Sequence, residues 1–272
     1  MDPFKHRVAV VTGAAGGIGS ALARAFAGRG ARLALADLDE SGLERLAKEL
    51  EARGAEALAV PTDVSRRESV EALAEATQRR FGAVHLVCNN AGVGTFGEMA
   101  TAPHEDWERT LAVNFWGVVH GVESFVPRLL EQGQGGHVLN TSSMAGLAGM
   151  RWLGIYSASK FAIVGLSEAL RRELQPRGIG VSVLCPMLAS PGMAQSLLGA
   201  SSSEASRPGE TPAPNALVGK IISAEEVAQR ALRGIERNDL YILTHFEQRE
   251  ILRRRAARLD AMFEDDVWPL SD

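Results

Sequence analysis

The chain has 272 residues, of which 46% are hydrophobic and 23% are charged, and its formal net charge is -4. This length is enough to bury a substantial core, and α/β domains of this size commonly form one unit. The small negative charge, with both signs interleaved, argues against a nucleic-acid partner and against a polybasic membrane surface. Because we find neither a signal-peptide pattern nor an apolar run of 18 residues, we expect a cytoplasmic protein without a membrane span.

Short apolar runs alternate with helical patterns along most of the chain. Strands are expected at 8–12, 32–36, 57–60, 84–88, 137–141, 180–184 and 240–243. Helices are expected at 20–29, 41–53, 66–81, 104–131 (with a break near 114–117 left open), from Tyr156 onward, after Ser223 and at 247–263. This alternation predicts an α/β fold, a doubly wound parallel sheet of about seven strands (a Rossmann fold) with helices on both faces. No linker or repeat interrupts it, which predicts one domain over 1–272.

The last third of the chain departs from this pattern. Residues 187–216 are rich in serine, proline and glycine, which predicts a substrate lid or a disordered loop there. Ser223, with Glu226 three residues later, has the pattern of a helix capping box. A charged helical extension is expected at about 246–265, and its arginine run, 253–255, reads as a solvated face or a subunit contact.

A glycine-rich turn follows the first predicted strand. Gly13, Gly17 and Gly19 lie between this strand and a helix, and Asp37 ends the next strand. Glycines at such a turn let a phosphate approach backbone N–H groups at a helix terminus. An acid at the end of the second strand fits the ribose hydroxyls of NAD and would repel the 2′-phosphate of NADP. The pattern predicts an NAD site, with NADP left open.

Tyr156 and Lys160 are four residues apart on a predicted helix, so both side chains lie on one face. An ammonium close to a phenol favours the phenolate, and we expect it to lower the pKa of Tyr156 from its usual value of about 10. A tyrosine tuned in this way suits proton transfer at neutral pH. By itself the pair also fits a surface tyrosine beside a solvated lysine.

Taken together, these motifs resemble the classical short-chain dehydrogenase/reductase family over roughly residues 7–186. The matching stretches are Thr12–Gly19, Asp63–Val64, Asn89–Gly92, Asn114, Asn140–Ser143 and Tyr156-x-x-x-Lys160. The resemblance implies a catalytic set of Asn114, Ser143, Tyr156 and Lys160. It implies cofactor contacts from Gly13, Gly17, Ile18, Gly19, Asp37, Asp63, Val64, Asn90, Ala91, Gly92, Tyr156, Lys160, Pro186 and Leu188.

The sequence departs from the family after the sixth strand, where Pro186 is followed by Met187 instead of the usual glycine. Candidate substrate residues are Ser143, Met144, Trp152, Tyr156, Met187 and Met193. Thr95, Phe96 and Arg151 could also line the substrate pocket. Most of these side chains are apolar, which favours a hydrophobic secondary alcohol or ketone, while Arg151 could pair with a carboxylate.

We therefore predict an oxidoreductase that transfers a hydride between NAD(H) and a hydrophobic secondary alcohol or ketone, with Tyr156 as general acid/base. Two alternatives stay open: an NADP-dependent ketoreductase, and a dinucleotide-binding module that senses redox state without turnover. No metal site is expected, because the two cysteines, Cys88 and Cys185, lack histidines at ligand spacing and read as buried thiols. The resemblance also implies a homodimer or homotetramer.

Overall fold

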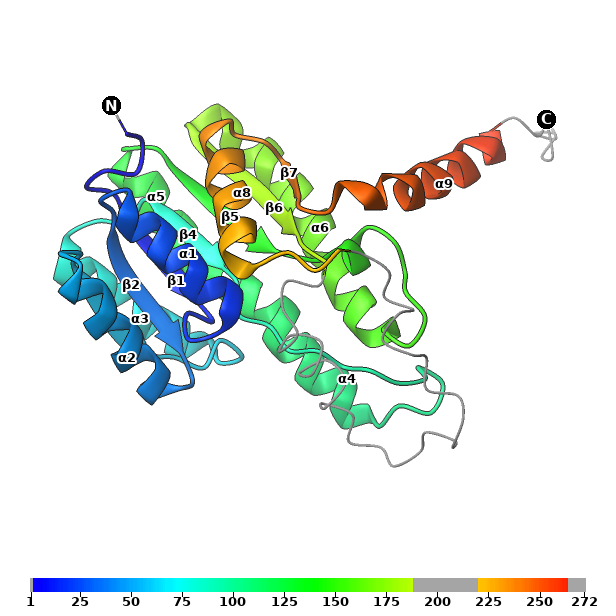
Figure 1. Cartoon of the computed structure of the whole chain (residues 1–272), viewed down its shortest axis with the longest axis horizontal. Coiled ribbons are helices and arrows are strands. Elements are labelled where there is room, and N and C mark those ends of the chain that lie inside the picture. The colour runs from blue at the N-terminus through cyan, green and yellow to red at the C-terminus, as the bar shows by residue number, and fades with distance from the viewer. Residues whose placement is uncertain (1, 188–219, 264–272) are drawn as a thin grey trace.

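The computed structural model describes residues 2–187 and 220–263 (Figure 1). These residues form a seven-stranded sheet in the order β3-β2-β1-β4-β5-β6-β7, and every neighbouring pair is parallel. The strands are β1 (Val8–Thr12), β2 (Arg32–Asp37), β3 (Ala57–Pro61), β4 (Leu86–Asn89), β5 (Gly136–Thr141), β6 (Ile179–Cys185) and β7 (Tyr241–Leu243). The predicted doubly wound sheet is confirmed.

Helices connect the strands and cover the sheet (Figure 1). They are α1 (Gly17–Gly28), α2 (Glu40–Ala52), α3 (Arg67–Phe81), α4 (His104–Leu111), α5 (Gly117–Gln132), α6 (Gly154–Leu174), α8 (Ala224–Glu236) and α9 (Arg249–Asp260). A π-helical segment, Ala112–Trp116, joins α4 to α5, so the break left open near 114–117 is a change of helix type. Ser223 caps α8 by accepting the N–H of Glu226, as the capping pattern predicts.

Each strand feeds two cores, because successive side chains point to opposite faces of the sheet. In β1, Ala9 and Val11 pack into the core shared with α1, α2 and α8. Val8 and Val10 pack into the core shared with α3, α5 and α6. Burial on both faces explains why this strand reads as one unbroken apolar run.

The strand order reverses between β1 and β4. The chain steps outward from β1 through β2 to β3, then returns to β4 on the other side of β1. In open α/β sheets, ligands bind outside the carboxyl ends of the strands at such a point. Thr12, Asn89 and Asn90, which end or follow these two strands, therefore lie at the expected place for a binding site.

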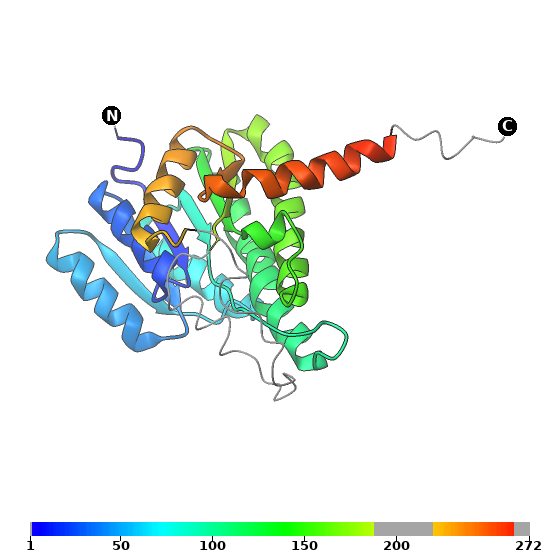
Figure 2. The same cartoon turned by 45° about the vertical axis from the view of Figure 1, so that its right-hand side comes forward.

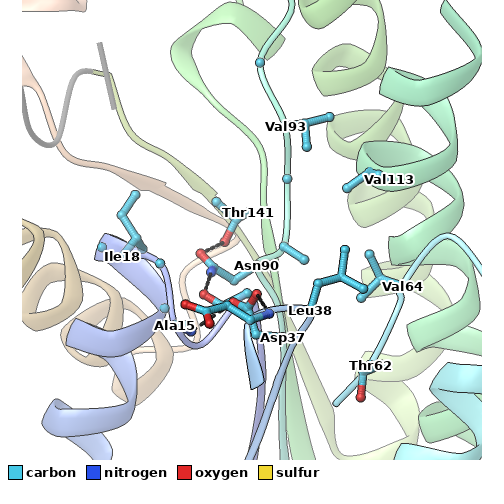
Figure 3. Close-up of a pocket in the computed structure, with 18 of the residues that line it drawn as sticks. Ala15, Ile18, Asp37, Leu38, Thr62, Val64, Asn90, Val93, Val113 and Thr141 are labelled. Carbon is cyan, nitrogen blue, oxygen red and sulfur yellow. Dashed lines mark hydrogen bonds between the residues drawn. The ribbon is translucent and has the colours of Figure 1, made fainter. Parts of the chain in front are cut away.

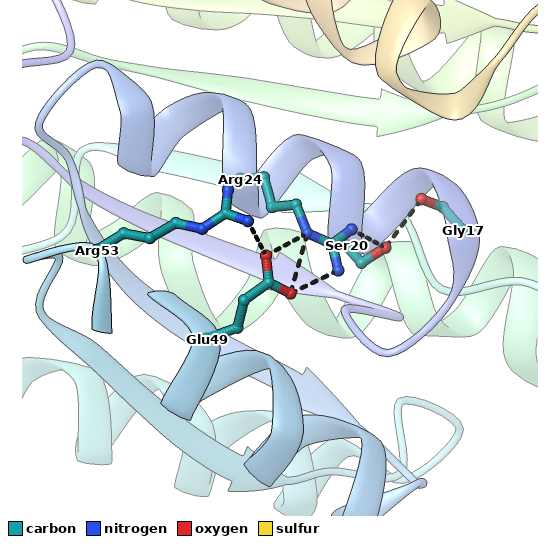
Figure 4. A network of polar contacts seen from close by, with 5 residues as sticks. All are labelled: Gly17, Ser20, Arg24, Glu49 and Arg53. Carbon is teal, nitrogen blue, oxygen red and sulfur yellow. Dashed lines mark hydrogen bonds and ion pairs between the residues drawn. The ribbon is translucent and has the colours of Figure 1, made fainter. Parts of the chain in front are cut away.

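An arginine–glutamate pair joins α1 to α2 close to the glycine turn (Figure 4). Arg24 Nη2 and Glu49 Oε2 are 2.8 Å apart, and Arg24 Nη1 donates to Ser20 Oγ at 3.1 Å. The Ser20 hydroxyl in turn donates to the carbonyl oxygen of Gly17 at 3.1 Å. Arg53 also pairs with Glu49, at 3.0 Å. This network fixes the first turn of α1 against the neighbouring helix.

The helix α9 projects beyond the rest of the described chain in both views (Figures 1 and 2), and none of its residues is buried. It contacts α6 through Arg255, whose Cζ lies 5.4 Å from the centroid of the Phe161 ring. The predicted extension at about 246–265 falls on α9 and its flanking short helical turns up to Phe263.

The predicted lid at 187–216 lies outside the described residues except for Met187. Within the described residues, no helix has the length and hydropathy needed to cross a membrane. Cys88 and Cys185 are buried free thiols, as predicted.

Candidate active site

The turn between β1 and α1 depends on glycine at two positions. Gly13 has a left-handed backbone (φ 66°), and a Cβ there would lie 2.8 Å from the Cα of Ala91. A Cβ on Gly19 would lie 2.0 Å from the carbonyl oxygen of Gly13. A Cβ on Gly17 would meet no atom within 4 Å, so this glycine leaves open space at the start of α1. The N–H groups and dipole at this helix terminus suit an anion such as a pyrophosphate.

Asp37, at the end of β2, is held between the glycine turn and the loop that follows it (Figure 3). Its Oδ2 accepts the N–H of Ala15 at 2.9 Å, and its Oδ1 accepts the N–H of Asp39 at 3.1 Å. Each carboxylate oxygen has a second lone pair, so Asp37 can still accept hydrogen bonds from a diol.

A hydrogen-bond network joins the carboxyl ends of β1, β4 and β5. The hydroxyl oxygen of Thr12 accepts the N–H groups of Asn90 and Ala91, at 2.9 and 3.1 Å. The side-chain amide of Asn90 donates to the carbonyl of Thr12 at 3.0 Å. Its oxygen accepts from the Thr141 hydroxyl at 3.2 Å (Figure 3). This network fixes the carboxyl ends of the three strands relative to one another. Asn89, by contrast, is buried and donates to Asn140 at 2.9 Å, which ties β4 to β5.

Asp63 and Val64 form the opposite rim of the cleft, after β3. Asp63 Oδ1 accepts from the N–H and hydroxyl of Ser65, at 3.0 and 2.6 Å. Val64 is 7% exposed and packs against Gly117, where a Cβ would lie 2.9 Å from Val64 Cγ2. Both side chains line the cleft at the site implied for an adenine contact.

The two serines after β5 have different environments. Ser142 donates to the carbonyl of Lys160 at 2.8 Å and so ties β5 to α6. Ser143 donates to the carbonyl of Pro186 at 3.3 Å, and its side chain lies close enough to the Tyr156 phenol to lower its pKa. Ser143, the serine of the predicted catalytic set, is thus the one that acts on Tyr156 in this structure.

The Tyr156–Lys160 pair is present, but the predicted pKa of Tyr156 is wrong for this structure. Lys160 Nζ lies 5.5 Å from the centroid of the Tyr156 ring and donates to the carbonyl of Thr141 at 2.9 Å. Burial raises the pKa of Tyr156 to about 12, and the Ser143 side chain, which lowers this pKa, only partly offsets the effect of burial. Burial also lowers the pKa of Lys160 to about 8. The site disfavours both the phenolate of Tyr156 and the ammonium of Lys160. Burial therefore outweighs the lowering of the Tyr156 pKa expected from the ammonium.

Asn114 lies in the π-helical segment and is fully buried. Its Oδ1 accepts the N–H of Val93 at 2.8 Å. Its Nδ2 donates to the carbonyl of Val93 and to the hydroxyl of Ser159, each at 3.0 Å. A Cβ on Gly92 would lie 3.2 Å from Asn114 Oδ1 and 3.4 Å from Lys160 Nζ, so the amide and the ammonium flank the same glycine. Asn114 thus joins the loop after β4 to α6.

Most of the predicted cofactor residues line one cleft of about 510 Å³, together with Tyr156 and Lys160 of the predicted catalytic set, whereas Asn114 and Ser143 are not among its lining residues. The cleft is lined by Gly13, Gly17, Ile18, Gly19, Asp37, Asp63, Val64, Asn90, Ala91, Gly92, Tyr156, Lys160 and Pro186, while Leu188 lies outside the described residues. Sequence reasoning missed the lining residues Ala15, Gly16, Leu38, Asp39, Thr62, Val93, Gly94, Val113, Thr141 and Ser142. All of them except Val113, which lies in the π-helical segment, share one signal, a position within a few residues of a strand's carboxyl end. Among the described residues, no group of three His, Cys, Asp or Glu side chains could hold a metal ion.

The structure describes every candidate substrate residue except Met193. Met144 is 1% exposed and does not line the described cleft, so the cleft does not support its predicted substrate contact. The backbone N–H of Met187 donates to His245 Nδ1 at 3.2 Å. Trp152 stacks on Phe96, with ring centroids 6.3 Å apart. Met193 lies outside the described residues. Thr95 is buried and hydrogen-bonds to Thr110, which places it in the packing of α4.

The family model for short chain dehydrogenases matches residues 7–200 of the chain. A solved short-chain dehydrogenase/reductase from Burkholderia phymatum, in complex with NAD, has 37% sequence identity and a TM-score of 0.86, with full coverage of both chains. The chain therefore belongs to the short-chain dehydrogenase/reductase family, whose members are oxidoreductases that use nicotinamide dinucleotides.

Curated relatives agree with this assignment. The 1-deoxy-11-beta-hydroxypentalenate dehydrogenase of Streptomyces exfoliatus is 37% identical over 268 residues, which is 97% of this chain and 90% of that protein. A Mycobacterium tuberculosis protein named "Probable oxidoreductase EphD" is 43% identical over 183 residues. That match covers 67% of this chain and only 31% of the longer relative.

Proposed function

We propose that the protein is an NAD-dependent alcohol dehydrogenase or ketone reductase. The observation that carries this proposal is one continuous cleft: the glycine turn and Asp37 line one part of it, and Tyr156 and Lys160 line another. The cleft has the parts that a dinucleotide needs, namely a helix terminus for the pyrophosphate and a fixed carboxylate for the ribose hydroxyls. Asp63, Val64, Asn90, Ala91, Gly92 and Pro186 would complete the cofactor contacts, with Leu188 as a further proposed contact.

Tyr156 is the proposed general base in oxidation and general acid in reduction. Ser143 would hydrogen-bond the substrate oxygen and hold it beside the Tyr156 phenol. A bound oxidised nicotinamide would supply the hydride acceptor for the carbinol carbon and a positive charge that would favour the phenolate of Tyr156. Tyr156 takes the hydroxyl proton as a phenolate, and Lys160 stabilises that phenolate. Asn114 would support a water that links Lys160 to solvent.

The preference for NAD over NADP is proposed from charge. Asp37 and Asp39 both line the cleft beyond β2. A 2′-phosphate at that end would meet carboxylates, and neither the glycine turn nor residues 38–40 supply a basic side chain. The NAD complex of the Burkholderia phymatum relative supports the same preference.

The proposed substrate is a hydrophobic secondary alcohol or the corresponding ketone. The Streptomyces exfoliatus relative is named for a hydroxylated carboxylate, 1-deoxy-11-beta-hydroxypentalenate. Trp152, which precedes α6, stacks on Phe96, which follows β4, and the two rings supply an aromatic surface four residues before Tyr156 in the chain. We also propose a homo-oligomer, which gel filtration at the size of a monomer would contradict.

The experiment is a screen of lipophilic secondary alcohols with NAD and with NADP, followed at the absorbance of the reduced nicotinamide. We expect Tyr156→Phe to lower kcat/KM by about 10²- to 10⁴-fold, the range for losing a general acid–base group. NAD binding, measured by calorimetry, should persist in this variant. Activity that survives Tyr156→Phe would reject the proposed mechanism. NAD binding by a wild-type protein without turnover of any alcohol or ketone would favour a non-catalytic module.

A further inference from the structure

Trp152 has a backbone conformation that a bulky residue seldom adopts. Its φ is 67°, in the left-handed region, and it lies four residues before Tyr156. The conformation is held in place because the carbonyl of Trp152 accepts the N–H of Gly97 at 2.8 Å. Strained backbone of this kind persists where the surroundings fix it, and it is concentrated at binding and catalytic sites.

The strained segment brings three side chains together before α6 in the chain. The indole of Trp152 lies 6.3 Å from the ring of Phe96, at an interplanar angle of 24°. On the indole lies the guanidinium of Arg151, with its Cζ 4.9 Å from the ring centroid. A cation over an indole face is attracted to it, so the stack fixes the position of this charge.

The loop that carries Phe96 is held at its base to Asn114 of the proposed catalytic set and further along to the residue before α6. At its base, Val93 makes two hydrogen bonds to Asn114. Further along, Gly97 bridges to Leu153, the residue that precedes α6. The same segment places Arg151 five residues before Tyr156, so their Cα atoms are at most about 17 Å apart.

Arg151 has no ionic partner in the part of the chain that the structure describes. It makes neither an ion pair nor a side-chain hydrogen bond to residues 2–187 or 220–263, and it is exposed. Arg109, which lies near the same loop, is by contrast paired with Asp106 at 3.4 Å. A guanidinium stacked on an aromatic ring keeps its N–H groups in one plane, where they can bind a carboxylate with two parallel hydrogen bonds.

We propose that Arg151 determines specificity by binding the carboxylate of a hydrophobic hydroxy-acid or keto-acid substrate, with the Trp152–Phe96 stack as the apolar wall. This inference rests on the proposed function and narrows its substrate class. The substrate would carry its secondary alcohol at Tyr156 and its carboxylate at Arg151. Arg151 binds the substrate and takes no part in proton transfer.

The test compares acids with their neutral esters. The probes are para-(α-hydroxyethyl)benzoate and ricinoleate, a short and a long secondary alcohol with a carboxylate, each beside its methyl ester. Wild-type enzyme with NAD should favour at least one acid over its ester by about three- to tenfold in kcat/KM, the size expected of a partly screened ion pair. Most of the difference should lie in KM, because the contact is the same in the ground and transition states. Added salt should reduce the preference for the acid over its ester, because salt screens the ion pair.

Two variants test whether the charge of Arg151 causes this preference. Arg151→Gln should raise KM for the favoured acid by about three- to tenfold and leave the ester unchanged. The matched control is Arg177→Gln, which removes the same charge from an exposed turn before β6, at the opposite end of the sheet. It should leave both substrates unchanged.

The outcomes separate this inference from the function on which it rests. Equal turnover of acids and esters by wild-type enzyme, or an equal loss for both in Arg151→Gln, would overturn the carboxylate site and leave the dehydrogenase intact. A wild-type enzyme that oxidises neither series would count against the proposed function and would remove the carboxylate site with it.

Discussion

The carboxylate of Asp37 accepts the backbone N–H of Ala15, with 2.9 Å between Oδ2 and the nitrogen. The residue proposed to select NAD is therefore also a structural part of the glycine turn. If Asp37 contacted only the ribose, its replacement would change only the preference for NAD over NADP. The hydrogen bond to Ala15 means that its replacement also changes the turn that receives the pyrophosphate.

We therefore expect Asp37→Ala to impair the enzyme with both cofactors. The variant loses a charge-assisted hydrogen bond, and the binding of NAD should weaken by about tenfold or more. NADP should gain little, although the repulsive charge is gone, because the turn is less well fixed. Kinetics with NAD and NADP measure both effects. Asp39→Asn, which keeps the cap of α2 and removes a charge two residues away, is the control and should retain NAD activity.

The glycine turn offers a second prediction. Gly19→Ala would put a Cβ 2.0 Å from the carbonyl oxygen of Gly13, so the turn must shift. We expect NAD binding to fall below detection by calorimetry and the melting temperature to drop by several degrees. Gly28→Ala, at the other end of α1, is the control because its Cβ would meet no atom within 4 Å. Normal NAD binding by Gly19→Ala would contradict the close approach on which the turn depends.

Much of this architecture can be predicted from the sequence because its signals are local. The alternation of buried strands and helices defines the sheet. The cleft lies where the strand order reverses, between β1 and β4. Residues such as Gly13 and Asp37 are recognisable from their position next to a strand end. Thr141 also ends a strand, but its contact with Lys160 is made by a backbone carbonyl, an atom that any residue type could supply, so its residue type does not reveal this contact.

The pKa of Tyr156 shows where such reasoning fails. The spacing of Tyr156 and Lys160 predicts their shared helix face, and the structure places them together. The spacing says nothing of burial, which depends on packing between β5, β6 and α6. Burial raises the pKa of the phenol to about 12, the opposite direction to the one predicted from the charge of Lys160. The π-helical segment around Asn114 is likewise set by tertiary hydrogen bonds.

Asn114 should affect both stability and turnover. Asn114→Ala removes three hydrogen bonds and leaves the N–H and carbonyl of Val93 without these partners. We expect the free energy of unfolding to fall by about 2–4 kcal/mol, since each buried unsatisfied group costs about 1–3 kcal/mol. Urea unfolding measures this loss. Asn114→Asp retains the acceptor for the Val93 N–H, and full stability in both variants would show that these hydrogen bonds contribute little.

His137 should make the fold sensitive to acid. Its Nε2 lies 2.8 Å from Ser182 Oγ, and the Ser182 hydroxyl donates to the carbonyl of Asp239, so the imidazole nitrogen must be the donor. Burial, with Arg171 nearby, lowers the pKa of His137 from 6.5 to about 4. The folded state thus binds a proton less readily than the unfolded state does. Stability is fully present above about pH 6.5 and falls as the pH drops to about 4, by as much as about 3 kcal/mol.

Urea unfolding at several pH values between 7 and 4 measures this slope. Burial also lowers the pKa of His85, so part of the slope should remain when His137 is replaced. We expect His137→Gln to flatten the curve, because a glutamine amide is neutral at every pH in the series. His104→Gln is the matched control, since the His104 side chain is 81% exposed and should leave the slope unchanged. An identical slope in wild type and His137→Gln would mean that the buried imidazole does not set the acid sensitivity of the fold.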